Sequence, residues 1–148
     1  MKNILLKTLS LLLFVLITGC GGGKDFVSIS LKSYENSNGG NAVVVTIYQL
    51  TNADKFSLSS FESLTKNPEG TLGSDLITTS TFEKTMVPGE SFKMDELEIK
   101  KEAAYLGIIA DFHTPSADGW QQVVSLNKSS DKVVISVLEN SISVKVED

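Results

Sequence analysis

Residues 42–50 of this chain read Ala-Val-Val-Val-Thr-Ile-Tyr-Gln-Leu, an almost unbroken run of apolar and β-branched side chains. Such side chains favour extended backbone. A run of this kind without polar alternation is typical of a strand that is covered on both faces. The stretch therefore predicts a central β-strand with other parts of the chain packed against each side of its sheet.

The sequence on both sides of this run alternates between apolar and polar residues with the period of a half-exposed strand. Before it, Val27, Ile29 and Leu31 are separated by single polar residues. After it, the same reading predicts six further strands, at 79–86, 91–99, 103–112, 120–126, 132–138 and 142–146. About eight short strands without a strand–helix–strand rhythm predict a mainly β fold, an antiparallel β-sandwich.

Helical signals fall in the long connection between the second and third of these strands. Leu58, Phe61 and Leu64 recur every third residue, and Ser59 and Glu62 have the spacing of a capping box. A second short helix is expected over residues 73–77. The sequence thus predicts a short helical insertion between strands 2 and 3.

The first twenty residues have the three parts of a bacterial export signal. Lys2 and Lys7 supply a positive end, and residues 9–17 are almost wholly apolar. A bilayer core needs about 20 apolar residues to be spanned, so this shorter run favours a secretory signal over a membrane helix. The sequence Ile-Thr-Gly-Cys at 17–20 resembles a lipobox, the aliphatic–small–small–Cys cleavage site of bacterial lipoproteins.

These features predict that residues 1–19 are removed and that Cys20 carries a diacylglycerol and an N-acyl chain. An ordinary signal peptide with an incidental cysteine is the alternative. It is disfavoured because Cys20 is the only cysteine in the chain and sits at the required position. We expect residues 20–25 to form a flexible tether and residues 26–148 to form one domain. The five residues after Cys20 reach at most roughly 17 Å.

The mature chain is acidic and lacks residue types that many catalytic and metal sites need. Loss of the signal with its two lysines leaves 11 basic residues against 18 acidic ones, a net charge of −7. No basic stripe for nucleic acid and no polybasic patch for anionic lipid is present in the sequence. His113 is the only histidine. We therefore expect no enzyme activity, no metal site and no cofactor other than the lipid on Cys20.

Three aromatic residues are weighed as binding or core residues. Tyr48 and Trp120 lie in alternating strands and are expected in the core. Tyr34 lies in a polar, turn-forming loop, where exposed aromatic side chains often act as recognition anchors. The candidate contact loop consists of Ser33, Tyr34, Glu35, Asn36, Ser37, Asn38, Gly39, Gly40 and Asn41.

Four blocks of the sequence resemble, in order, those of one bacterial family. Residues 43–50, with Phe56 and Phe61 after them, are followed by Leu-Gly-Ser-Asp-Leu at 72–76, Val-Pro-Gly-Glu-Ser at 87–91, and Tyr-Leu-Gly-Ile-Ile-Ala-Asp-Phe at 105–112 with Trp120 beyond. Together with the lipobox, these blocks cover essentially the whole chain. They resemble the TssJ (SciN/VasD-like) family, the outer-membrane lipoproteins of type VI secretion systems.

The resemblance implies a transthyretin-like β-sandwich that is anchored in the outer membrane by its lipid and faces the periplasm. It also implies that the loop Ser33–Asn41 binds the periplasmic C-terminal domain of the inner-membrane component TssM. Gly21 after Cys20 favours outer-membrane delivery. The alternative is a periplasmic lipoprotein that binds a small ligand or carbohydrate on a sandwich face, which predicts an aromatic-lined pocket with an apolar floor.

Overall fold

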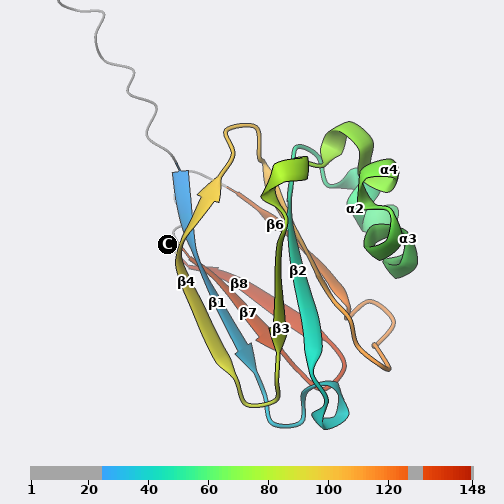
Figure 1. Ribbon diagram of the computed structural model, residues 1–148, viewed down its shortest axis with the longest axis vertical. Helices are drawn as coiled ribbons and strands as arrows, with labels where there is room; N and C mark the ends of the chain where they lie inside the picture. The colour runs from blue at the N-terminus through green and yellow to red at the C-terminus, as the bar shows by residue number, and fades with distance from the viewer. Residues whose placement is uncertain (1–24, 127–131, 148) are drawn as a thin grey trace, which may run out of the picture.

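The computed structural model describes residues 25–126 and 132–147, which form two four-stranded sheets packed face to face (Figure 1). The strands are β1 (Asp25–Ser33), β2 (Val43–Leu50), β3 (Phe82–Met86), β4 (Ser91–Ile99), β5 (Tyr105–Ala110), β6 (Gln121–Ser125), β7 (Lys132–Val137) and β8 (Ile142–Glu147). The predicted eight-stranded sandwich is confirmed. The first strand begins at Asp25, which sequence reasoning had placed in the tether, because Asp25 pairs with Ile99 of β4.

The two sheets differ in how their strands pair. One has the order β3-β2-β5-β6 and is antiparallel throughout its described strands. The other has the order β4-β1-β7-β8, and β1 runs parallel to β7 from the pair Ser28–Lys132 to the pair Ser33–Val137. The first strand therefore pairs with β7, the second-to-last strand, and the first and last strands lie in the same sheet. Strand patterning alone did not predict this parallel pair.

The main core lies between the two sheets. The predicted alternation holds in β1, where Val27, Ile29 and Leu31 are buried. In β2 the core face carries Val45 and Ile47, which are also buried. Burial of side chains of this size stabilises the fold by roughly 1.5–3 kcal/mol each relative to exposure.

A second, smaller core covers the opposite face of β2. Tyr48 and Leu50 pack there with Phe56, Leu64 and Leu72 from the helical insertion. In Figure 1 the insertion lies beside the half of the sheet that is nearer to the start of β1. This second core explains why β2 is apolar along nearly its whole length, and the prediction of a strand covered on both faces is confirmed for this half.

The insertion contains α2 (Asp54–Leu58), α3 (Phe61–Lys66) and α4 (Pro68–Leu72). The predicted capping pair was wrong by one residue. Ser60 is the N-cap of α3, and its hydroxyl accepts a hydrogen bond from the Ser63 N–H at 3.2 Å. Ser59 instead ends α2 and donates its hydroxyl to the Lys55 carbonyl, while Glu62 pairs with a lysine one turn along.

The second predicted helix, over 73–77, is replaced by two short 3-10 turns, η3 (Gly73–Asp75) and η4 (Thr78–Ser80). The α-helix lies earlier, at α4, where Pro68 occupies the first turn and the Asn67 side chain caps the Gly70 N–H. Proline suits a first turn because its missing N–H has no intrahelical partner there. The turn at η4 also delays β3, which starts at Phe82 and not at residue 79.

Candidate functional site

Four connections gather at the end of the sandwich that lies opposite the start of β1; we call this the loop end. It consists of residues 34–42 between β1 and β2, 87–90 between β3 and β4, 111–120 between β5 and β6, and 138–141 between β7 and β8. Figure 1 shows the β1–β2 connection at one end of the molecule and the start of β1 at the other. The nine residues of β1, rising about 3.3 Å each, separate the two ends by roughly 26 Å.

Residues of the predicted contact loop divide into two groups by burial. Ser33, Ser37 and Asn38 are buried, with 1%, 0% and 5% of their surface exposed. The two serine hydroxyls are hydrogen bonded to each other at 2.6 Å. The remaining six residues are exposed: Tyr34, Glu35, Asn36, Gly39, Gly40 and Asn41. The surface that the loop offers to another molecule is therefore smaller than the predicted segment, because three of its members hold the loop in place.

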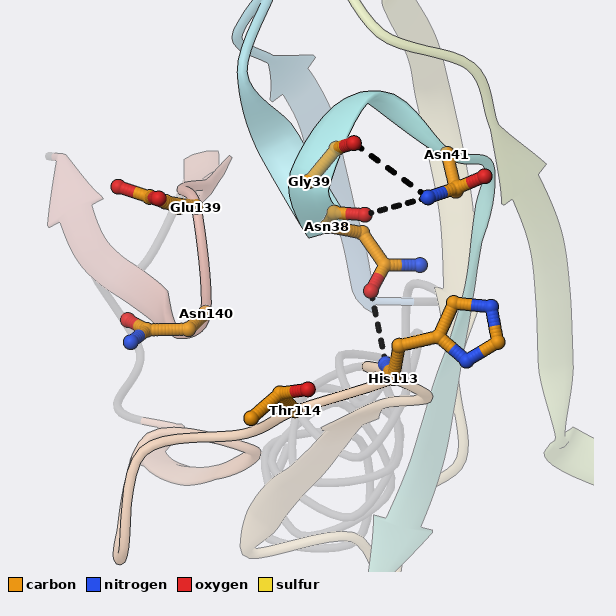
Figure 2. Close-up of a pocket in the computed structure, with 7 residues that line it drawn as sticks. All are labelled: Asn38, Gly39, Asn41, His113, Thr114, Glu139 and Asn140. Atoms are coloured by element: carbon orange, nitrogen blue, oxygen red, sulfur yellow. Dashed lines mark hydrogen bonds between the residues drawn. The ribbon is translucent and has the colours of Figure 1, made fainter.

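Asn38 connects the β1–β2 loop to the β5–β6 loop (Figure 2). Its Nδ2 donates to the Ala42 carbonyl at 2.8 Å, and its Oδ1 accepts from the backbone N–H of His113 at 2.7 Å. Its backbone is left-handed, with φ 49° and ψ 38°, a conformation that asparagine adopts more readily than most residues. Gly39 and Gly40 follow with positive φ as well, which glycine tolerates without strain. The Asn- and Gly-rich composition thus encodes one defined turn.

The other side of the loop is fixed to the β3–β4 turn and to β7. The Ser33 N–H donates to the Glu90 carbonyl at 2.8 Å, and the Tyr34 N–H donates to the Val137 carbonyl at 3.1 Å. Gly89 has φ 78°, and a Cβ placed on it would lie 2.6 Å from an Oε1 of Glu35. The left-handed backbone therefore favours glycine at this turn, whereas the exposed Glu35 carboxylate could move aside.

The aromatic residues lie as the sequence predicted. Tyr34 is 42% exposed, and the Lys32 ammonium sits 5.0 Å from the centre of its ring. Tyr48 is buried and donates its hydroxyl to the Leu64 carbonyl at 3.1 Å. Trp120 is half-buried and packs against both cores. Of the three, Tyr34 is the most exposed, and it lies in the β1–β2 connection.

A polar cavity of about 410 Å³ lies among three of these connections. Figure 2 shows the residues that line it: Asn38, Gly39, Asn41, His113, Thr114, Glu139 and Asn140. The last three were not singled out from the sequence, because they belong to turns far along the chain whose only signal was their turn composition. The sequence predicts each of these turns, but it does not show that they lie next to one another in the fold.

The described part of the chain brings together no catalytic or metal-binding constellation. No group of three or more His, Cys, Asp or Glu side chains there is placed to hold a metal ion. Within the same ranges, no helix has the length and apolar character needed to cross a membrane. Cys20 and its predicted lipid lie outside the described residues.

The fold and the loop end define the class: a β-sandwich protein whose organised surface is a set of interlocked polar loops. The model of the family described as "Type VI secretion lipoprotein, VasD, EvfM, TssJ, VC_A0113" matches residues 29–148. The chain therefore belongs to this family of type VI secretion lipoproteins. Its members are structural lipoproteins and not enzymes, so the predicted family and the predicted lack of enzymatic activity are both confirmed.

Solved structures support the fold independently. The T6SS lipoprotein TssJ1 from Pseudomonas aeruginosa matches with a TM-score of 0.78 and 22% identity, over 85% of this chain and 98% of that one. Serratia marcescens Lip, described as a membrane-bound component of the type VI secretion system, matches with a TM-score of 0.70 and 16% identity, over 81% and 96%. A structure described as the TssM C-terminal domain from EAEC contains a chain that matches with a TM-score of 0.68 and 21% identity, over 81% and 97%. No curated protein sequence matches the chain closely enough to count as a relative.

Proposed function

We propose that this protein is an outer-membrane-anchored structural lipoprotein of the type VI secretion membrane complex, and that its loop end binds the periplasmic domain of TssM. The observation that carries the proposal is the position of the loop end, at the opposite end of β1 from Asp25, which is the fifth residue after Cys20 in the sequence (Figure 1). A lipid on Cys20 would hold the start of β1 near the membrane. The loop end would then point away from it, toward a partner that comes from the inner membrane.

The lengths are consistent with this arrangement. The predicted tether reaches at most roughly 17 Å. The β1 strand adds roughly 26 Å more, so the loop end lies within about 45 Å of the membrane surface. The partner must therefore approach the outer membrane closely, which favours a structural subunit of a complex over a protein that carries ligands across the periplasm.

The construction of the loop favours binding to another protein. Asn38 and Ser33 fix the loop to its neighbours, so little conformational entropy remains to be lost when a partner binds. Tyr34 gives this fixed surface an exposed aromatic ring, the kind of side chain that often dominates an interface. The family assignment supports this structural role over the alternative of a small-ligand carrier.

The test is co-purification of the full lipidated chain, in detergent, with the periplasmic domain of TssM. Tyr34→Ala is the perturbing variant. Leu58→Ala is its matched control, because Leu58 is a large apolar side chain with 89% of its surface exposed on α2, outside the loop end. We expect the wild type and Leu58→Ala to bind alike and Tyr34→Ala to bind at least about tenfold more weakly. Failure of the wild type to bind, or equal binding by the two variants, would show that the loop end is not the TssM site.

A further inference from the structure

A second hollow lies on the outer face of the β3-β2-β5 sheet, next to α3, and only Asp111 among its lining residues belongs to the loop end. It has a volume of about 260 Å³, several times the roughly 30 Å³ that one water molecule occupies in the liquid. Tyr48, Ile109 and Phe61 form its apolar part, and Thr46, Glu83 and Asp111 contribute its polar groups. It is therefore large enough for a side chain of another molecule and carries two acidic groups.

The strand register places the two carboxylates on opposite sides of the central strand. Thr46 of β2 is paired with Glu83 of β3 on one side and with Ile109 of β5 on the other. Asp111 follows β5 on the same face as Ile109, and its N–H donates to the Val44 carbonyl at 2.9 Å. Two strand spacings of about 4.8 Å separate β3 from β5, and Asp111 lies beside Val44, two residues from Thr46, so the carboxylates flank β2 on opposite sides and are offset along it.

The two carboxylates of this hollow have no lysine partner in the described part of the chain, as is true of several other exposed carboxylates. Glu62, Glu90 and Glu147 each pair with a lysine, whereas neither Glu83 nor Asp111 has a lysine within 4.0 Å in residues 25–126 and 132–147.

Thr46 adds a hydroxyl group to the wall of the hollow. Only 7% of its surface is exposed, and its hydroxyl makes no hydrogen bond with any residue that the structure describes. The hydroxyl is not fully enclosed, so water can reach it in the hollow, and a ligand that enters would offer it a hydrogen-bond partner in place of that water.

The electrostatic influence of Glu83 reaches the floor of the hollow. The pKa of Tyr48 is raised above its ordinary value, first by burial and second by the negative charge of Glu83. The hollow is thus a partly enclosed site of negative potential with an apolar wall.

We propose that this hollow receives an arginine side chain from a basic segment of a protein partner. A guanidinium group is planar and carries five N–H donors, so it can donate to Glu83 and Asp111 on its two sides and to the Thr46 hydroxyl below. Its methylene groups would lie against Phe61 and Ile109. Lysine would supply the charge, but its three donors diverge from a single point and match two separated carboxylates less well.

Carbohydrate, the ligand of the alternative reading, fits the same hollow poorly. A sugar ring stacks on an open aromatic face, but Tyr48 is only 4% exposed and its hydroxyl is already used on the Leu64 carbonyl. Phe61 is half-buried and stands edge-on to Trp120, with ring centres 5.5 Å apart. The remaining polar groups are anionic acceptors, which favour a cation over a neutral polyol.

The proposal goes beyond the function proposed for the loop end, because the hollow lies on a side face of the sandwich. A partner that used both surfaces would be held at two separate points. Loss of binding at one surface leaves the other intact, so the two proposals can fail independently.

Trp120 provides a direct readout, since it is the only tryptophan in the chain and its ring contacts Phe61 on the wall of the hollow. The full lipidated chain in detergent is titrated with N-acetyl-arginine amide while Trp120 fluorescence is recorded. N-acetyl-citrulline amide, which has the same shape without the charge, is the matched probe. We expect a saturable change with the arginine probe and none with the citrulline probe.

Variants then assign the contacts. Glu83→Gln and Asp111→Asn should each weaken binding of the arginine probe about three- to fivefold, as expected for the loss of one partly exposed ion pair. Thr46→Val keeps the shape of the side chain and should also weaken binding. Glu62→Gln, on an exposed carboxylate of α3 that pairs with a lysine, is the control and should leave binding unchanged.

Three results would overturn the proposal: equal responses to the arginine and citrulline probes, no response to either, or a saturable response to glucose in place of arginine. The last would support a carbohydrate site. The comparison of the two probes uses the wild-type protein alone, so it decides the question even where a variant folds poorly.

Discussion

Replacing Asn38 with alanine removes the side chain that holds the β1–β2 loop to the β5–β6 loop. The His113 N–H loses its acceptor and the Ala42 carbonyl loses a donor. A buried polar group left unpaired costs about 1–3 kcal/mol. Because His113 and Ala42 are themselves exposed, water replaces part of the loss, and we take about 1 kcal/mol for each. Alanine also tolerates the left-handed backbone at this position less well than asparagine, by about 1 kcal/mol.

These contributions give a decrease of about 2–4 kcal/mol in the free energy of unfolding of Asn38→Ala. For a domain of this size the melting temperature should fall by roughly 8–15 °C. Two further variants separate the causes. Asn38→Gly loses the same hydrogen bonds but accepts the backbone angle, so it should be about 1 kcal/mol more stable than Asn38→Ala. Asn38→Asp keeps an acceptor for the His113 N–H and loses the donor to Ala42, so it should lie between the wild type and alanine.

Urea unfolding of the wild type and the variants measures these differences. Asn41→Ala is the matched control, because Asn41 is exposed and its side chain bonds only to carbonyls of the same loop, at 3.1 and 3.4 Å. It should change the free energy of unfolding by about 0.5 kcal/mol or less. The reasoning is refuted if Asn38→Ala is as stable as Asn41→Ala, since the loop would then be held by other contacts.

Three further predictions concern other parts of the molecule. The hydrogen bond from Lys84 lowers the pKa of the Glu90 carboxyl below its ordinary 4.5. The ionised carboxylate therefore stabilises the fold above pH 4.5, and this stabilisation is lost as the pH falls through the lower pKa of the folded state. In urea unfolding, Glu90→Gln should make the loss of stability between neutral and acid pH smaller than in the wild type. Gly107→Ala would place a Cβ 2.7 Å from a ring carbon of Phe56 and should destabilise the fold by about 1–3 kcal/mol in thermal unfolding, whereas an unchanged midpoint would show that the ring moves aside freely. Cys20→Ser should move the protein out of the membrane fraction on cell fractionation while its unfolding midpoint stays the same, and continued membrane association would refute the lipid anchor.

Most of the fold could be predicted from the strand pattern, because burial of one face of a strand imposes a period of two on the sequence. The alternation in β1 and the apolar run in β2 were both interpreted correctly. Helix ends were harder to predict. Ser59 and Ser60 are adjacent serines with similar capping chemistry, and only the geometry of the chain between α2 and α3 decides which hydroxyl meets an open N–H.

The residues of the candidate site were also predictable only in part. The sequence marked Tyr34 as an aromatic residue in a polar loop, and the structure leaves it exposed. It did not mark Asn38 as the centre of the loop, because the partner of Asn38 is the His113 N–H, 75 positions away. The hollow between Glu83 and Asp111 could not be predicted either, because Glu83 lies in β3 and Asp111 follows β5, and these two strands flank β2 only in the folded sheet.

The sequence by itself determined the features that depend on neighbouring residues: the expectation of a lipid anchor, the eight strands, the turns, and the family to which they belong. The tertiary structure alone decided which turns meet. It paired β1 in parallel with β7, joined Asn38 to His113, and left the Thr46 hydroxyl at the hollow without a hydrogen-bond partner among the described residues. The physical reason is that strand and turn propensities act over a few residues, whereas hydrogen bonds and cavities between strands depend on pairings that the chain makes only when both cores are closed.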